Sequence, residues 1–166
     1  MKKKLHLKRK LKKKFSFKIA LYSALAIILT AIIGSSFTDV SGWYEAVKPS
    51  ALTPPNYIFP IVWTILYILI GFSMTLSITN SHGITRNKLI ALFAINLFFN
   101  ALWNILFFGF HYTQIAFMDL ILILLSTLAL INVSWKVSRL SSWLLLPYAI
   151  WVSYAGLLNF IIAFMH

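Results

Sequence analysis

The sequence predicts an all-α membrane protein, a bundle of five transmembrane helices, and three observations support this prediction. Of the 166 residues, 60% are hydrophobic and 11% are charged, whereas soluble domains are about 45–50% apolar and about 25% charged. Five apolar stretches approach the roughly 20 residues that a helix needs to cross a bilayer. Ten of the 15 Lys and Arg residues lie within the first 18 residues. A hydrophobic body with a basic head excludes a soluble enzyme and a nucleic-acid-binding protein.

The five predicted spans cover about residues 19–37, 57–79, 88–110, 114–137 and 143–164. The connection before the second span is the longest, and its last residues, Pro54 and Pro55, suit the first turn of a helix. Turn formers at 80–83, a tight turn at 109–113 and polar residues at 136–142 separate the later spans. The expected N-caps of those spans are Thr85, Thr113 and Ser141 or Ser142. We expect one membrane domain, residues 19–166, after a basic tail, residues 1–18.

The first span allows two interpretations. A basic segment, an apolar run and small residues are also typical of a secretory signal peptide. The run of nearly 19 residues is long for a signal, however, and Ala26, Thr30 and Gly34 form a ridge of small residues on which another helix can pack. We predict that this helix is retained as a transmembrane span.

The basic tail also allows two interpretations. Leu7, Leu11 and Phe15 recur every four residues among lysines, which would suit an interfacial helix on anionic lipid. The alternative, which we favour slightly, is a disordered segment that only sets topology. With the N-terminus in the cytoplasm, 14 of the 15 basic residues lie inside and only Lys48 lies outside. This division satisfies the positive-inside rule and places the C-terminus outside after five spans.

Aromatic and amide side chains form stripes on three spans. The third span carries Asn96, Asn100 and Asn104 at intervals of four residues, with Trp103 and Phe107 on the same side. Similar stripes on the second and fifth spans comprise Phe59, Trp63, Tyr67, Tyr148, Trp151, Ala155 and Asn159. Amides that faced lipid would stay unpaired, so the stripes must face protein or a cavity. Hydrogen bonding between helices and a pocket for a flat apolar ligand both fit.

Ordinary catalytic and metal sites find little support in the sequence. Asp119 is the only carboxylate within a span, and an acid there is either functional or stabilised by the nearby helix N-terminus. We favour the structural role. The four histidines are scattered, and no pair has the spacing of metal ligands. Because the chain has no cysteine, thiolate metal sites and cysteine nucleophiles are excluded.

Several motifs in order resemble those of one known family. They are WYEAVKP at 43–49, TPP at 53–55, FPIVWTILY at 59–67, NALWN at 100–104, AFMD at 116–119, LPYAIWVSYA at 146–155 and LN at 158–159. Over about residues 20–160 the chain closely resembles the TspO/MBR family, which comprises tryptophan-rich sensory proteins and mitochondrial translocator proteins. The fifth span lacks the Tyr followed by Lys or Arg that forms a cholesterol pattern in some relatives.

The resemblance implies a five-helix bundle whose long first loop covers a ligand cavity. It implies protoporphyrin IX, haem-like tetrapyrroles or drug-like apolar molecules as ligands, with no obligatory cofactor and no metal. By matching positions, and by the stripe that adds Tyr67, the ligand-binding residues would be Tyr44, Pro54, Trp63, Tyr67, Asn100, Trp103, Trp151, Ala155 and Asn159. Some relatives are reported to break down protoporphyrin IX in light, which would give Trp63 and Trp151 a photochemical role.

Four functions remain open at this point. A tetrapyrrole-binding receptor or sensor is the leading hypothesis, and a transporter of porphyrins or other small hydrophobic molecules is the alternative. Photo-oxidative degradation of the porphyrin would be the only enzymatic activity, because no acid–base pair supports ordinary catalysis. A scaffold in which Asn and Trp only pack helices is the fourth. The partners to test are a second copy of the chain, in a homodimer, and anionic lipid, through the basic tail.

Overall fold

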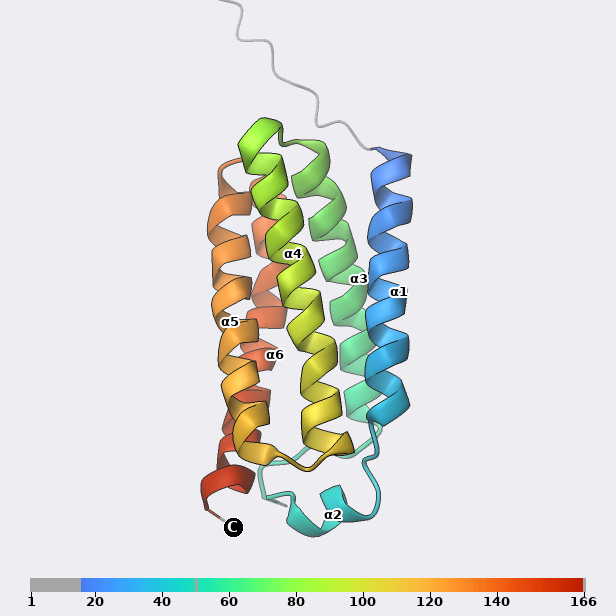
Figure 1. Cartoon of the computed structure of the whole chain (residues 1–166), viewed down its shortest axis with the longest axis vertical. Coiled ribbons are helices and arrows are strands. Elements are labelled where there is room, and N and C mark those ends of the chain that lie inside the picture. Colours follow the sequence, from blue (N-terminus) through green and yellow to red (C-terminus); the bar gives the residue numbers. More distant parts are fainter. Residues whose placement is uncertain (1–15, 50, 166) are drawn as a thin grey trace, which may run out of the picture.

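The structure is a computed structural model that describes residues 16–49 and 51–165. In these residues five long helices stand side by side with alternating direction (Figure 1). They are α1 (Phe17–Phe37), α3 (Ile58–Thr79), α4 (Gly83–Asn104), α5 (Thr113–Trp135) and α6 (Arg139–Phe164), and each is long and apolar enough to cross a membrane. A short helix, α2 (Trp43–Val47), lies across one end of the bundle. The predicted all-α class and the five spans are confirmed.

Two helices begin earlier than the apolar patterns indicate. Helix α4 begins at Gly83 rather than near residue 88, so Thr85 lies inside its first turn and is not its N-cap. Helix α6 begins at Arg139 rather than near residue 143, and the hydroxyl of Ser138 caps it by accepting from the backbone N–H of Ser141. Hydropathy marks only the apolar part of a helix, whereas the backbone continues to coil through polar residues beyond it.

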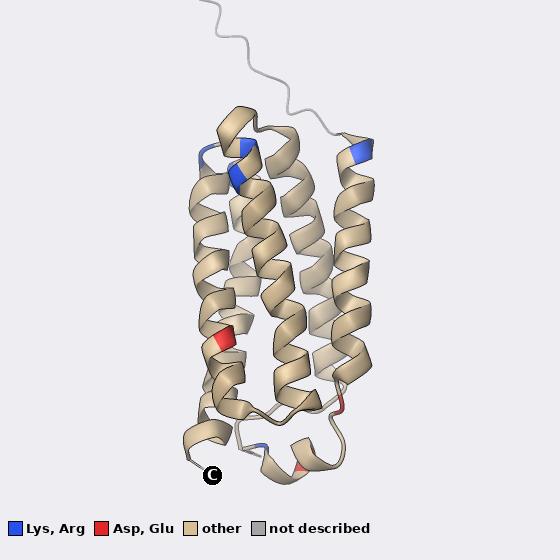
Figure 2. Ribbon diagram, viewed as in Figure 1, with Lys and Arg blue, Asp and Glu red and all other residues tan. Residues whose placement is uncertain are grey.

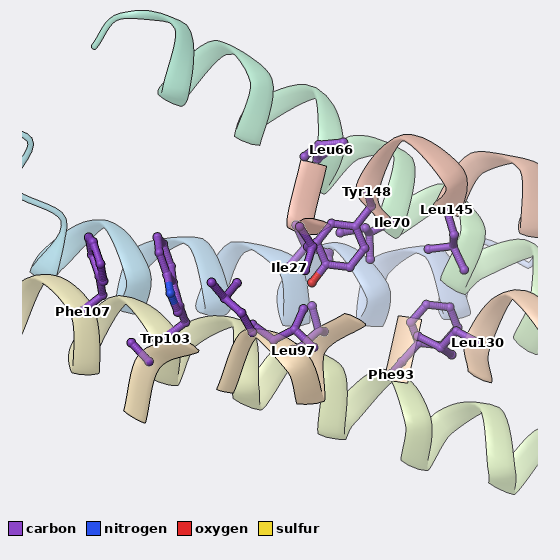
Figure 3. Close-up of a cluster of buried hydrophobic side chains, with 14 of the residues drawn as sticks. Ile27, Leu66, Ile70, Phe93, Leu97, Trp103, Phe107, Leu130, Leu145 and Tyr148 are labelled. Atoms are coloured by element: carbon purple, nitrogen blue, oxygen red, sulfur yellow. The ribbon is translucent and has the colours of Figure 1, made fainter. Parts of the chain in front are cut away.

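The five long helices pack in the closed order α1, α3, α6, α5, α4, and α3 also touches α4. Helix α5 packs against α4 and α6, α6 packs against α3, and α1 leans on α3 and α4. Buried side chains from all five helices meet along the axis of the bundle (Figure 3). Large apolar side chains also cover the outer surface, including Leu25, Phe72 and Ile150. Such a surface is soluble only in lipid, and the protein is a multi-pass integral membrane protein.

The charged side chains separate to the two ends of the bundle. Lys18, Arg86, Lys88, Lys136 and Arg139 lie at the end where α1, α4 and α6 begin, which we call the basic end (Figure 2). The first connection and α2 lie at the opposite end, which we call the lid end. The hydrophobic repeat of the tail at Leu7, Leu11 and Phe15 lies outside the described residues, so both interpretations of it stay predictions.

Candidate ligand-binding cavity

A cavity of about 720 Å³ opens inside the bundle at the lid end. Its walls come from α1, α3, α6 and the last turns of the third span, and its roof is the lid, which we define as residues 38–49 and 51–57. The volume lies within the range of about 300–1,000 Å³ that is usual for small-molecule sites. Side chains on this wall are mainly aromatic and aliphatic, and none of the residues described as lining it is Asp, Glu, Lys, Arg or His. Such a site suits an apolar ligand.

Tyr44 forms the centre of the roof. Its side chain is buried, and its ring packs edge-on against Phe59, Phe107 and Phe108 at centroid distances of 6.2, 6.1 and 5.6 Å. Burial raises the pKa of the Tyr44 phenol to about 12, so the group is neutral at neutral pH. The roof therefore presents a neutral aromatic surface to the cavity.

Polar contacts at its rim fasten the lid. The ammonium of Lys48 lies 2.7 Å from the carboxylate of Glu45. The side-chain amide of Asn56 donates to the same carboxylate and to the carbonyl of Val40, both at 3.1 Å. At the far side, the hydroxyl of Tyr154 on α6 donates to the carbonyl of Leu52. These bonds tie α2, both ends of the lid and α6 together.

A wider turn ends the third span and shapes one wall. Residues Ile105–Gly109, element η1, form a π-helical turn in which the N–H of Phe110 donates to the carbonyl of Ile105 at 3.0 Å. Such turns often occur at functional sites. The chain then reverses at His111, which has a positive φ of 56° and whose ring stacks on Trp43 of the lid at 4.1 Å. The wider turn coincides with two successive rings, Phe107 and Phe108, on the cavity wall.

Indole rings from two helices dominate the opposite walls. Trp63 of α3 and Trp151 of α6 are half-buried and line the cavity. Trp63 lies 5.5 Å from the ring of Tyr67, and Trp151 lies 6.0 Å from that of Phe59. A third indole, Trp103, is buried and stacks on Phe107 (Figure 3), with the ring centroids 5.1 Å apart. The first two rings retain surface that a ligand can contact.

The amide stripe of α4 divides into three different roles. Asn96 is buried against α5, where it donates to the side chains of Ser126 and Thr127. Asn104 lies on the cavity wall and accepts from the hydroxyl of Thr38 at 2.8 Å. Asn100, between them, accepts from the hydroxyl of Tyr67 at 2.7 Å. Asn96 thus fits the hydrogen-bonding interpretation of the stripe, and Asn104 fits the pocket interpretation.

Comparison with known proteins places the chain in a family. The profile of the TspO/MBR family matches residues 22–165. The chain is 36% identical over 142 residues to the tryptophan-rich protein TspO of Archaeoglobus fulgidus, covering 84% of this chain and 92% of that protein. It is 37% identical over 123 residues to protein CrtK of Rhodobacter capsulatus (71% and 74%) and 30% identical over 141 residues to the human translocator protein (82% and 83%). The chain belongs to the TspO/MBR family.

Seven of the nine predicted ligand-binding residues line the cavity of this TspO/MBR protein. They are Tyr44, Trp63, Tyr67, Trp103, Trp151, Ala155 and Asn159. Pro54 and Asn100 are not among the lining residues. Asn100 lies one layer behind the wall, where its amide also donates to the hydroxyl of Tyr148 at 3.0 Å. Its position suits a residue that holds Tyr67 in place rather than one that touches a ligand.

Asn159 is on the wall, but its amide is engaged with protein. The oxygen accepts from the indole N–H of Trp103 at 3.2 Å, and the nitrogen donates to the carbonyl of Thr113 at 2.8 Å. Both polar atoms therefore have a protein partner, and the side chain is almost fully buried. Asn159 positions Trp103 at the cavity and joins α6 to the start of α5.

The sequence analysis did not assign the wall that α1 contributes. Ala31 and Gly34 of α1 line the cavity beside the C-cap Thr38, and a Cβ atom at Gly34 would lie 3.0 Å from the amide nitrogen of Asn104. Glycine there lets α1 approach α4 closely. The small-residue ridge that contains Gly34 was the available signal, although it predicts helix packing rather than a cavity wall. Phe107, also unassigned, had its signal in the stripe on the third span.

Asp119 is buried in α5, and neither carboxylate oxygen has a hydrogen-bond partner among the described residues. It does not line the cavity. Groups of three or more His, Cys, Asp or Glu side chains that could hold a metal ion are also absent from the described part of the chain. The side chains that line the cavity are aromatic, aliphatic, hydroxyl and amide groups.

Proposed function

We propose that this chain is a membrane receptor or sensor that binds a porphyrin-type tetrapyrrole in the cavity beneath the lid. The single observation that carries the proposal is the cavity itself, about 720 Å³ in volume, with exposed indole surface from α3 and α6 and uncharged lining residues. A planar aromatic ligand gains apolar burial there, together with about 0.5–1.5 kcal/mol for each aromatic contact. The family membership supports the same ligand class.

Different residues of the wall would make different contacts with the ligand. Trp63 and Trp151 would contact the faces or edges of the ring system, and Ala155 would leave room for it beside Trp151. Asn56 and Tyr154 lie where the wall meets the lid. Their donors already bond within the lid or to it, so these residues would shape the edge of the site rather than bond the ligand.

A closed basic end favours a receptor over a transporter. There the hydroxyl of Ser73 on α3 donates to the backbone carbonyl of Ser141 on α6 at 2.8 Å, and both residues are fully buried. A transporter must open its site to each side of the membrane in turn. Protein-dependent porphyrin flux across liposomes would nevertheless establish transport.

The binding test is a titration of the purified protein with protoporphyrin IX in darkness. Saturable quenching of tryptophan emission is expected because the porphyrin would lie beside Trp63 and Trp151. Absence of saturable quenching would contradict the proposal. Illumination in air then tests breakdown, with the porphyrin absorbing light and dioxygen as the oxidant. If the porphyrin absorption band is lost only when protein, light and dioxygen are all present, the protein promotes degradation. If the band is stable, the protein binds the porphyrin without degrading it.

We also propose that the basic end faces the cytoplasm and the lid end faces outward. The positive-inside rule supports this orientation. Residues 1–18 contain ten Lys and Arg, and the basic end adds Arg86, Lys88, Lys136 and Arg139. A tag at Lys2 should be shielded in intact cells, and one after His166 should be accessible from outside. The reverse accessibility would reverse the orientation of the lid.

A further inference from the structure

We propose that the ligand reaches the cavity from the lipid, through a groove between α1 and α3. This inference rests on the proposed binding function. The groove has a volume of about 470 Å³ and extends along α1 and α3 from the cavity toward the basic end. Four residues, Ile28, Ala31, Thr64 and Tyr67, line both the groove and the cavity. The two spaces are therefore adjacent and share a wall.

The groove is built to admit an apolar molecule. On α1 it is floored by small side chains at Ala20, Ala24 and Ala31, and on α3 by Gly71. Its two threonine hydroxyls are occupied within their own helix, since Thr64 donates to the carbonyl of Pro60 and Thr75 to that of Gly71. No lining residue described for the groove is charged. A ligand sliding along it would not have to displace a polar contact.

The groove faces lipid. Ile28 and Ile68 are each 53% exposed, and Phe72 is 52% exposed. Helix α1 packs on α3 and α4, and it is the least buried of the five long helices. A porphyrin or drug-like molecule concentrates in a bilayer because its apolar surface leaves water there. The opening thus faces the phase in which the ligand accumulates.

The alternative route, through the lid, is held closed by contacts between the lid and the bundle. The hydroxyl of Tyr154 on α6 bonds the carbonyl of Leu52 in the lid, and the ring of Trp43 packs on Phe107 and His111. Opening the lid would break these contacts together, whereas no hydrogen bond or ion pair joins α1 to α3 among the described residues. Side-chain rotamers exchange far faster than loops rearrange. The lateral route is therefore the faster one.

The absence of cysteine from the chain makes a selective blockade possible. Ala24→Cys places a single thiol in the groove but outside the cavity wall, and N-cyclohexylmaleimide converts it into a bulky apolar adduct. Leu125→Cys, on the exposed surface of α5, carries the same adduct away from the groove as the matched control. A third variant, Lys48→Met, removes the ion pair within the lid without altering a residue that lines the cavity.

The measurement is stopped-flow tryptophan quenching by protoporphyrin IX, with the full chain in nanodiscs and the porphyrin delivered from vesicles in darkness. We expect the Ala24→Cys adduct to slow binding and release by about tenfold together, leaving Kd unchanged because only the path is altered. The Leu125→Cys adduct and Lys48→Met should bind at the parental rate. Faster binding by Lys48→Met, or an unchanged rate for the Ala24→Cys adduct, would overturn the proposal.

A second measurement tests the path without the porphyrin. A spin-labelled hydrocarbon dissolved in the bilayer quenches any tryptophan that it reaches, and the difference between the parent chain and Trp63→Phe reports access to Trp63. This difference should fall when the adduct fills the groove. If the parent chain fails to bind protoporphyrin IX but the adduct still shields Trp63, the ligand assignment is wrong and the lateral path stands. If the adduct shields nothing, the path is wrong.

Discussion

The two ends of this bundle use the same helices in opposite ways. At the basic end, α3 and α6 meet through Ser73 and Ser141, whose hydroxyl oxygens are 3.0 Å apart and whose side chains are fully buried. At the lid end, the same two helices present Trp63 and Trp151 to a cavity of about 720 Å³. Small hydroxyl side chains let membrane helices approach closely. Bulky rings meet across the same pair of helices at the lid end, Phe59 with Trp151 at 6.0 Å. The difference teaches that side-chain size along one pair of helices distinguishes its closed end from the end that borders a cavity.

Breaking the closed end should have the largest effect. Ser141→Leu inserts a larger apolar side chain between α3 and α6 and removes the hydroxyl that bonds Ser73. Overpacking and a lost buried hydrogen bond together should lower the free energy of unfolding by about 3 kcal/mol. Denaturation in mild detergent, followed by circular dichroism, measures this loss. Ser153→Leu, on the exposed face of the same helix, is the control and should change stability little.

The next largest effect concerns the residue between the two regions. Asn100→Leu removes the acceptor for Tyr67 and the donor to the buried Tyr148, so both hydroxyls lose a partner. We expect unfolding to become easier by about 1–2 kcal/mol. Porphyrin binding should weaken in parallel because Tyr67 is no longer held. Tyr67→Phe removes only the bond between Tyr67 and Asn100, so it should lower stability less than Asn100→Leu does. Equal losses of stability in the two variants would contradict the role of the bond to Tyr148.

Filling the open end should abolish much of the binding and spare the fold. Ala155→Leu adds three carbon atoms to the cavity wall, and we expect affinity for protoporphyrin IX to fall by about tenfold or more, equivalent to about 1.4 kcal/mol. Gly156→Leu is the matched control, because a Cβ atom at Gly156 meets no heavy atom within 4 Å. Equal affinities for the two variants, measured by tryptophan quenching, would place the ligand elsewhere.

The sequence predicts the closed framework better than the open site. Apolar stretches of about 20 residues identify all five helices, because the bilayer sets one length for each of them. Their ends are less certain, as Gly83 and Arg139 show, since polar residues do not stop a helix from continuing. Helix α2 was not predicted, because five residues are too few for a hydrophobic period to be recognised.

At the site, periodicity identifies which residues share a face but not which layer they occupy. Trp63 and Asn100 both belong to stripes, yet the first lines the cavity and the second lies behind it. That distinction depends on distances between helices, which no single helix encodes. The contribution of α1 depends in the same way on the close approach of Gly34 to Asn104.

A smaller effect would sharpen the aromatic half of the comparison. Trp63→Phe and Trp151→Phe keep a ring in the wall, so each should reduce affinity by less than about 1 kcal/mol. Each should also reduce quenching by protoporphyrin IX and slow any photodegradation, since an indole beside the ligand is lost. Trp135→Phe, at the basic end where the ring is 44% exposed, should change none of these measurements. If all three variants show the same fractional quenching and the same rate of porphyrin bleaching as the parent chain, Trp63 and Trp151 are packing residues.

The smallest effect is a pH dependence confined to the lid. Hydrogen bonds from Lys48 and Asn56 lower the pKa of the Glu45 carboxyl below its ordinary value of 4.5. A depressed pKa means that the bonds stabilise the lid fully above 4.5 and are lost as the pH falls through the lower, folded value. Hydrogen exchange of the α2 backbone, corrected for its intrinsic pH dependence, should therefore accelerate in the parent chain on acidification, whereas the Ser73–Ser141 region should not respond. Glu45→Gln, which cannot ionise, should exchange at one corrected rate throughout; an equal response in both chains would mean that the lid is held by its aromatic contacts, Trp43 on His111 above all.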